Sequence, residues 1–335
     1  MEIRPKYEQG GTPRASRRQA EGTKRAPNHP KKARRGHQGG TKRARKSPKR
    51  ARRGHQTINI ISGNGVNLDM LRISELHIYP IKSLGGIALQ EATLSDRGFT
   101  YDRRWMLVDN ENRFISQREV ADMALLKVSL QEQGLQVKHI HRPGSEFIIP
   151  FEPAISETEM VTIWGDRCRA QLVSAAADTW FSDQLGMSCK LVYMPDTTRR
   201  LVDGRYANNK EVTSFSDAFP LLIIGQASLD DLNSRLPAVL PMNRFRPNIV
   251  FTGGTPYQED EMKQFDIAGI TFYGVKPSAR CTITTIDQQT AEKAKEPLKT
   301  LHTYRQRNNN VYFGQNLLYQ GAGTVRVGDT ITIST

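Results

Sequence analysis

Cysteine is scarce in this sequence, and long apolar runs are missing. The three cysteines, Cys168, Cys189 and Cys281, are too few to form a disulfide framework, so each is judged singly. No apolar run approaches the roughly 18 to 20 residues that a membrane-spanning helix needs. The N-terminus also lacks the apolar core of a secretory signal. We therefore expect a soluble protein in a reducing compartment, the cytoplasm.

The common cofactor motifs are absent as well. The sequence has no GxxxxGK phosphate loop, no GxGxxG dinucleotide fingerprint, no HExxH and no paired CxxC. Each of these motifs places backbone amides or side-chain ligands at a fixed spacing around a nucleotide or a zinc ion. The usual nucleotide-binding and zinc-binding classes therefore have no support.

Basic charge is abundant, but it is unevenly distributed. The chain of 335 residues carries 48 Lys and Arg against 34 Asp and Glu, a formal net charge of +14. Residues 1–56 hold 19 of these basic residues and 3 acidic ones, so residues 57–335 have 29 basic and 31 acidic residues, a net charge of −2. The polyanion-binding character suggested by the whole composition therefore belongs to an N-terminal tail.

The tail contains a repeat and has almost no hydrophobic residues. The sequence over 22–38 recurs over 40–56, and such a segment buries too little apolar surface to offset the entropy of ordering, so we expect residues 1–69 to be disordered. One interpretation is an upstream extension with no role, because the composition changes abruptly near Met70. The alternative is a nucleic-acid-binding arm, in which clustered Lys and Arg displace phosphate counterions.

From Leu71 onward, short runs typical of strands dominate, and turn-forming residues separate them. The expected strands are 71–79, 104–108, 162–173, 190–194, 248–252, 270–273, 282–286 and 324–333. Two helices are predicted, one over 175–185 ended by Gly186 and one with Ser228 as its N-cap. The fold class is therefore mainly β (α+β), with a few covering helices. A polar stretch over 194–210 predicts a boundary, which divides the folded part into residues 70–195 and 196–335.

Cys281 is the cysteine with a chemically suggestive neighbourhood. In the segment KPSARC it follows Arg280 directly, and Lys276 precedes it by five residues. Nearby cations favour a thiolate, which is the form that ligates soft metals. The plainer interpretation of a single cysteine is a small buried hydrophobic residue. We keep that interpretation for Cys168 and Cys189, which lie in runs typical of strands.

Three other segments place cationic donors at the ends of predicted strands. Lys82 and Ser83 follow the first strand, Arg103 precedes the second, and the run Arg244–Asn248 supplies two arginines and an amide. Guanidinium, ammonium and amide groups at a strand end can hold an anion. Structural salt bridges in solvated turns are the alternative.

Taken together, the motifs resemble those of MOSC proteins, which are named for the C-terminal domain of molybdenum-cofactor sulfurase. Residues 71–118, with LHIYPIKS, GFTYDRRWMLVD and FISQRE, resemble the MOSC N-terminal β-barrel domain. Residues 215–333, with NRFRPNIVFTGG, KPSARCTITTID and GTVRVGDTI, resemble the MOSC domain. Within the superfamily the chain is most similar to the bacterial YcbX type and to the mitochondrial amidoxime-reducing components.

The resemblance implies a pterin molybdenum cofactor whose metal is ligated by Cys281. It implies that the phosphate and the pterin of this cofactor are held by Lys82, Ser83, Arg103, Arg246 and Asn248. The implied reaction is the reduction of an N-hydroxylated substrate, such as a hydroxylamine, an amidoxime or an N-hydroxylated nucleobase, to the amine or amidine and water. For Arg280 we hypothesise a catalytic role, the stabilisation of charge on the thiolate or on the departing oxygen. At the level of the family, pyridoxal phosphate binding is implied too.

The chain departs from the family pattern in two ways. Relatives often read KPCSRC where this chain has Ser278 and Ala279, so a hydroxyl next to Arg280 is lost. The YcbX type usually carries a C-terminal ferredoxin-like domain, and this sequence has no such cysteine cluster. We therefore expect a separate electron-donor protein, ferredoxin-like or a flavoprotein. The alternative function is a carrier that binds molybdenum cofactor or sulfur without turnover.

Overall fold

The computed structural model describes residues 70–207 and 209–334 of the chain. The basic repeat over 1–69 lies outside the described residues, so the interpretations of the tail stay hypotheses. Strands prevail over helices in the described part, and the predicted mainly β fold is confirmed. None of its helices has the length and apolarity needed to cross a bilayer. The cytoplasmic location stays a prediction.

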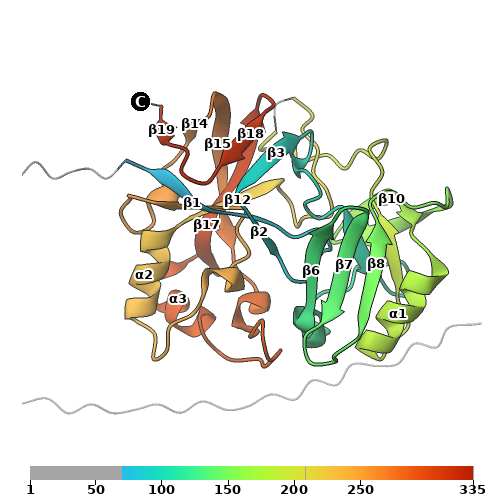
Figure 1. The fold of residues 1–335 in the computed structure, drawn as a ribbon. Coiled ribbons are helices and arrows are strands. Elements are labelled where there is room, and N and C mark those ends of the chain that lie inside the picture. Colours follow the sequence, from blue (N-terminus) through green and yellow to red (C-terminus); the bar gives the residue numbers. More distant parts are fainter. Residues whose placement is uncertain (1–69, 208, 335) are drawn as a thin grey trace, which may run out of the picture. The chain divides into compact units, whose positions relative to one another are not determined.

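The largest sheet in the described residues has nine strands and takes strands from both ends of the chain (Figure 1). Its order is β19 (Ile331–Ile333), β14 (Gln264–Ile267), β15 (Ile270–Ala279), β17 (Asn310–Gln320), β12 (Leu221–Gly225), β13 (Ile249–Thr252), β1 (Arg72–Ile78) and β2 (Ile87–Leu89), with β16 (Gln306–Arg307) beside β17. Strands β12 and β13 are parallel, whereas β1 runs antiparallel to β13. The blue strand β1 thus lies among strands of the C-terminal half.

Three smaller sheets complete the strand pairing of the described part. One has the order β5 (Trp105–Val108), β11 (Lys190–Tyr193), β10 (Asp166–Leu172) and β9 (Thr158–Ile163). A second joins β18 (Thr324–Arg326), β3 (Glu91–Ser95) and β4 (Gly98–Phe99), and the third joins β6 (Leu126–Gln131), β7 (Gly134–His139) and β8 (Glu146–Pro150). Because β18 pairs with β3, the second sheet also combines the two ends of the chain.

The helices are short and lie against these sheets (Figure 1). They are α1 (Ala175–Leu185), α2 (Gln226–Ser234) and α3 (Leu298–Arg305), together with the 3-10 turns η1 (Ala121–Leu125), η2 (Met242–Arg244), η3 (Gln258–Asp260) and η4 (Thr282–Thr285). Helix α1 has the predicted bounds, because Ser174 caps its first turn and Gly186 ends it with a φ of 65°.

The second helix prediction was wrong at its start. Helix α2 begins at Gln226 with Gly225 as its N-cap, so Ser228 lies inside the helix. The Ser228 hydroxyl donates to Glu259 Oε2 at 2.8 Å and accepts from the backbone N–H of Tyr257 at 2.7 Å. Tertiary partners on η3 therefore occupy the hydroxyl that the sequence pattern assigned to a cap.

The segment over 282–286, predicted as a strand, forms the 3-10 turn η4. Two threonine hydroxyls explain the difference, because Thr284 Oγ1 donates to the carbonyl of Cys281 at 3.0 Å and Thr285 Oγ1 to that of Thr282 at 2.8 Å. Such local bonds compete with strand pairing. The predicted strands over 162–173 and 324–333 are each split in two, into β9 and β10 and into β18 and β19. The sequence analysis did not predict helix α3 or the strands β2–β4, β6–β8, β12, β14, β16 and β17.

Packing joins the first strand to the C-terminal half. Strand β1 has a bulge after Ile73, and the extra residue brings Ile73 and Leu76, three positions apart, into the same core. In that cluster they pack with Phe251, Phe265 and Leu317 from the other end of the chain. A second cluster, around Trp105, Phe181 and Leu191, fills the N-terminal part. The domain boundary at 195/196 stays a prediction.

Candidate functional site

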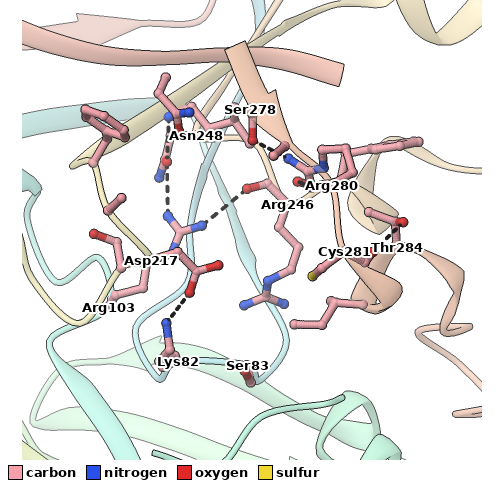
Figure 2. Close-up of a pocket in the computed structure, with 18 of the residues that line it drawn as sticks. Lys82, Ser83, Arg103, Asp217, Arg246, Asn248, Ser278, Arg280, Cys281 and Thr284 are labelled. Carbon is pink, nitrogen blue, oxygen red and sulfur yellow. Dashed lines mark hydrogen bonds and ion pairs between the residues drawn. The ribbon is translucent and has the colours of Figure 1, made fainter. Parts of the chain in front are cut away.

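One pocket gathers the seven residues to which the sequence analysis assigned a cofactor-binding, metal-ligating or catalytic role (Figure 2). Its walls come from the loop after β1, the loop before β5, the loop before β13 and the end of β15. The predicted residues that line it are Lys82, Ser83, Arg103, Arg246, Asn248, Arg280 and Cys281. Because these segments lie up to 199 positions apart in the sequence (281 − 82), only the fold brings them together.

Lys82 lies almost wholly buried at one side of the pocket. Its Nζ donates to the carbonyl of Phe215 at 2.9 Å and to Asp217 Oδ1 at 2.6 Å. Burial lowers the pKa of Lys82, while the adjacent Asp217 carboxylate opposes that shift. The pKa of Asp217 lies below its ordinary value, because attraction to the Lys82 ammonium outweighs the desolvation that would raise it. The pair is therefore charged, with a buried cation and a half-exposed anion.

Tyr79 contacts two of the arginines. The guanidinium carbon of Arg103 lies 4.4 Å from the centre of the Tyr79 ring, and that of Arg246 lies 4.2 Å from it. The Tyr79 hydroxyl donates to the carbonyl of Pro247 at 3.1 Å, and burial raises the pKa of this phenol to about 12. Both guanidinium groups therefore make cation–π contacts with the same neutral ring.

Hydrogen bonds fix the orientation of Arg103. Its Nη1 donates to the buried carboxylate of Asp102 and, at 3.0 Å, to Asn248 Oδ1. Asn248 Nδ2 in turn donates to the carbonyl of His77 at 3.1 Å. Burial raises the pKa of Asp102, although the Arg103 cation opposes this effect. Arg103 and Asn248 are thus held by β1 and by each other.

Three of the site residues have a left-handed backbone. The φ angle is 68° at Ser83, 49° at Arg103 and 55° at Arg246. Residues with a Cβ adopt this region at a free-energy cost, and it persists only where surrounding contacts enforce it. At Arg246 one such contact is visible, because its Nη1 donates to the carbonyl of Leu84 at 2.6 Å. Three of the twelve non-glycine residues with a positive φ in the described part therefore line this pocket.

Cys281 lies just beyond the end of β15 and is the N-cap of η4. It is partly exposed, whereas Cys168 and Cys189 are buried. Burial raises the pKa of Cys168 to about 11 and also raises the pKa of Cys189, which agrees with their interpretation as small core residues. In Figure 2 the Cys281 sulfur and the Arg246 guanidinium point into the same space.

Arg280, next to Cys281, is held by its own segment and by the loop before β13. Its Nη2 donates to the carbonyl of Phe245 at 2.5 Å, and its Nη1 donates to the hydroxyl of Ser278 at 3.0 Å. The chain therefore has a hydroxyl bound to this guanidinium, although Ala279 lacks one. Ser278 lines the pocket as well.

The pocket fits an anionic group. Its lining contains one carboxylate, Asp217, and five cationic side chains, namely Lys82, Arg103, Arg118, Arg246 and Arg280. Two buried donors, Arg246 Nη2 and Arg280 Nε, have no hydrogen-bond partner among the described residues. Buried donors of this kind are normally satisfied, so a ligand with acceptor oxygens matches them. Within residues 70–207 and 209–334 no group of three potential metal ligands occurs, so a metal here would depend on Cys281 and its own cofactor.

The pocket also differs from the prediction at some positions. Arg244 faces Asp287 at 3.6 Å and does not line it, and the Lys276 ammonium lies over the ring of Tyr206. Tyr79 and Asp217 were missed, although both lie in segments that the resemblance had already singled out. Arg118, in the segment FISQRE, was missed in the same way. The prediction of pyridoxal phosphate binding stays a prediction.

Family models match most of the described chain. Residues 70–188 match the model described as "MOSC N-terminal beta barrel domain", and residues 210–332 match the "MOSC domain" model. The loop of Lys82 and Ser83 falls in the first match, and Cys281 falls in the second. The pocket is therefore formed by residues from both matched regions.

Several relatives are similar over nearly the whole described part. The mouse (Mus musculus) mitochondrial amidoxime-reducing component 1 is 30% identical over 279 residues, which cover 77% of this chain and 81% of the relative. Component 2 of the rat (Rattus norvegicus) is also 30% identical, with 77% and 82% covered. The molybdenum cofactor sulfurase of rice (Oryza sativa subsp. japonica) is 30% identical over 76% of this chain, which spans only 34% of that relative.

Proposed function

The chain belongs to the MOSC family, with the MOSC N-terminal barrel and the MOSC domain in one protein, and we propose that it is a molybdenum-cofactor-dependent reductase of N-hydroxylated compounds. The relatives that it matches over most of their length are named amidoxime-reducing components. Their name supports an oxidoreductase that acts on an N–O bond.

The convergence of cationic donors and one accessible thiol in a single pocket carries this proposal. Lys82, Arg103 and Arg246 would hold the anionic part of the cofactor, with Ser83 and Asn248 as neutral hydrogen-bonding partners. Cys281 would supply the thiolate ligand of the metal. Tyr79 and Asp102 keep two of the arginines oriented, so little rearrangement is needed on binding.

The reaction consumes two electrons and two protons per N–O bond. A compound R–NHOH gives R–NH₂ and water, and an amidoxime gives the amidine and water in the same way. When bound, the cofactor would supply the two-electron redox chemistry that cleaves the N–O bond. The electrons come from a separate donor protein, ferredoxin-like or a flavoprotein. Arg280 lies next to Cys281 and would stabilise negative charge at the thiolate.

The first experiment is metal and pterin analysis of the full chain, produced in a host that makes molybdenum cofactor. We expect about one molybdenum per wild-type chain and a loss of at least about tenfold in Cys281→Ala, because the metal loses its protein ligand. Cys168→Ala is the matched control, since it removes a thiol that lies on β10 outside the pocket, and it should retain the metal.

Turnover is tested next with benzamidoxime and reduced methyl viologen as the electron donor. Wild-type protein should form benzamidine, and Cys281→Ala should not. Wild-type protein that holds molybdenum but reduces no hydroxylamine, amidoxime or N-hydroxylated nucleobase would contradict the reductase proposal.

A carrier that binds the cofactor or sulfur without turnover is the second candidate function. The similarity to a molybdenum cofactor sulfurase favours it, because this chain matches only about a third of that protein. The same experiments distinguish the two functions. A carrier would hold molybdenum through Cys281 and would release the cofactor intact to an acceptor protein, but it would reduce no substrate.

A further inference from the structure

A pair of buried glutamines connects the loop of Ser83 to the segment that follows Cys281. Gln117, before η1, is fully buried, and Gln288, between η4 and α3, is 5% exposed. Gln288 Nε2 donates to Gln117 Oε1 at 2.9 Å, and Gln117 Nε2 donates to Gln288 Oε1 at 3.2 Å. The amides thus form a reciprocal pair between segments 171 residues apart. Neither glutamine lines the pocket.

On one side the pair holds the loop of Ser83. Gln117 Nε2 also donates to the carbonyl of Ser83 at 2.6 Å. Ser83 has a φ of 68°, so its backbone needs an external contact to stay in this region. The neighbouring carbonyl of Leu84 is held by Arg246. Gln117 is therefore one of two side chains that fix the backbone next to Lys82.

On the other side the pair holds the segment that follows Cys281. Gln288 Nε2 donates to the carbonyl of Ile286 at 3.1 Å, and Lys127 Nζ donates to the carbonyl of Gln288. Gln288 follows Cys281 by seven residues (288 − 281), and η4 fills most of that interval. In η4, both the backbone N–H and the hydroxyl of Thr284 donate to the carbonyl of Cys281. Gln288 is therefore connected to Cys281 by one short, hydrogen-bonded turn.

We propose that the Gln117–Gln288 pair is a positioning device that sets the place of the Ser83 loop relative to Cys281. The anion-binding end and the thiol end of the pocket belong to different segments, and this pair bonds one to the other through buried amides. A ligand that spans both ends gains affinity when their separation is fixed before it binds. The inference rests on the proposed function, in which one anionic cofactor contacts both ends.

Leucine substitutions separate this role from simple stabilisation. Gln117→Leu or Gln288→Leu leaves one buried amide without its partner, so each single variant should have a lower melting temperature. The double variant removes the unpaired amide but still leaves the carbonyls of Ser83 and Ile286 without their donors, so it should recover only part of that loss. Gln136→Leu, on β7 and outside the pair and the pocket, is the control for the substitution itself.

The decisive readout is the rate at which molybdenum leaves the full chain during dialysis. We expect release about tenfold faster in each single variant and about equally fast in the double variant, because outer residues that orient ligands typically alter metal affinity by 10–100-fold. A double variant that melts at a higher temperature than either single variant but loses molybdenum as quickly supports positioning. Wild-type release from the double variant, or release rates that follow the melting temperatures, would overturn the inference.

A second probe keeps this test separate from that of the proposed function. Inorganic phosphate is titrated into the cofactor-free full chain by calorimetry, and its Kd should rise about tenfold in Gln117→Leu, which frees the Ser83 carbonyl. If the wild-type chain holds no molybdenum, the proposed function fails while the phosphate titration still tests the pair. Unchanged phosphate affinity in Gln117→Leu would contradict the role of Gln117.

Discussion

Tyr79 shows how one ring can determine the shape of an anion-binding pocket. Arg103 and Arg246 both contact its ring, and the edge of the ring lies against Gly86. A Cβ at position 86 would lie 2.4 Å from Tyr79 Cε1, so only glycine leaves room for the ring. The space available at one backbone position therefore controls the separation of two cations.

We expect Gly86→Ala to lower the free energy of unfolding by about 2 kcal/mol, because the ring must shift in a packed environment. The displaced ring should also weaken phosphate binding, since both stacked guanidinium groups lose their support. Urea denaturation measures the first effect and calorimetric titration measures the second. Gly204→Ala is the matched control, because nothing lies within 4 Å of a Cβ there. Equal stability of the two variants would refute the steric argument.

At the residue scale, the sequence motifs pointed to residues that line one pocket but not to their arrangement. Lys82, Ser83 and Cys281 could be predicted, because their motifs resemble those of the MOSC family. The left-handed backbone of Ser83 could not be predicted, since it depends on an amide from Gln117 and on Arg246, which is 163 positions away (246 − 83). Contacts of that range leave no local pattern in the sequence.

At the scale of elements, the turn η3 carries a buried acid that is linked to helix α2. Glu259 is fully buried, and its Oε2 accepts from Ser228, while Oε1 has no hydrogen-bond partner among the described residues. Burial raises the pKa of Glu259 to about 7, and the hydrogen bond from Ser228 opposes this shift only in part. The protonated acid is therefore the form that the fold accommodates best.

This burial predicts a pH dependence of stability. Between pH 4.5 and pH 7 the folded protein binds more protons at Glu259 than the unfolded chain, so the free energy of unfolding falls as the pH rises. The loss amounts to about 3 kcal/mol across this window. Glu259→Gln should remove this part of the pH dependence, as measured by the melting temperature from pH 4 to pH 8. The exposed Glu261→Gln should leave the wild-type profile unchanged, and an identical profile for Glu259→Gln would contradict the assignment.

Local signals predicted some elements correctly and failed at others for identifiable reasons. Helix α1 has its cap and its terminating glycine in sequence, so its bounds were predicted. The start of α2 was not, because Ser228 bonds to Glu259, which is 31 residues away. The turn η4 is rich in β-branched residues, yet the threonine hydroxyls of Thr284 and Thr285 bond to backbone carbonyls within the turn. Side-chain hydrogen bonds therefore account for both wrong predictions, the start of α2 and the strand at 282–286.

At the scale of the whole described molecule, the sheets cross the predicted boundary between residues 195 and 196. Strand β1 pairs with β13, and β3 pairs with β18. We therefore expect a fragment of residues 196–335 to lack a cooperative unfolding transition, because β13 loses its neighbour and the core cluster around Phe251 loses Ile73 and Leu76. Circular dichroism melting of the fragment, beside the full chain, measures this. A sharp transition in the fragment would show that the C-terminal half folds alone.

The pairing of β3 with β18 also has a consequence for the order of events during synthesis. Thr93 lies opposite Thr324, so strand β3 leaves the ribosome 231 residues before its partner is made (324 − 93). At roughly 5 to 20 residues per second, that interval lasts at least about ten seconds. During this time the edge of β3 has none of its final partners from the C-terminal end, and unpaired strand edges are prone to aggregation. We therefore expect that protection of this strand edge during synthesis, for example by a chaperone, raises the yield of folded protein.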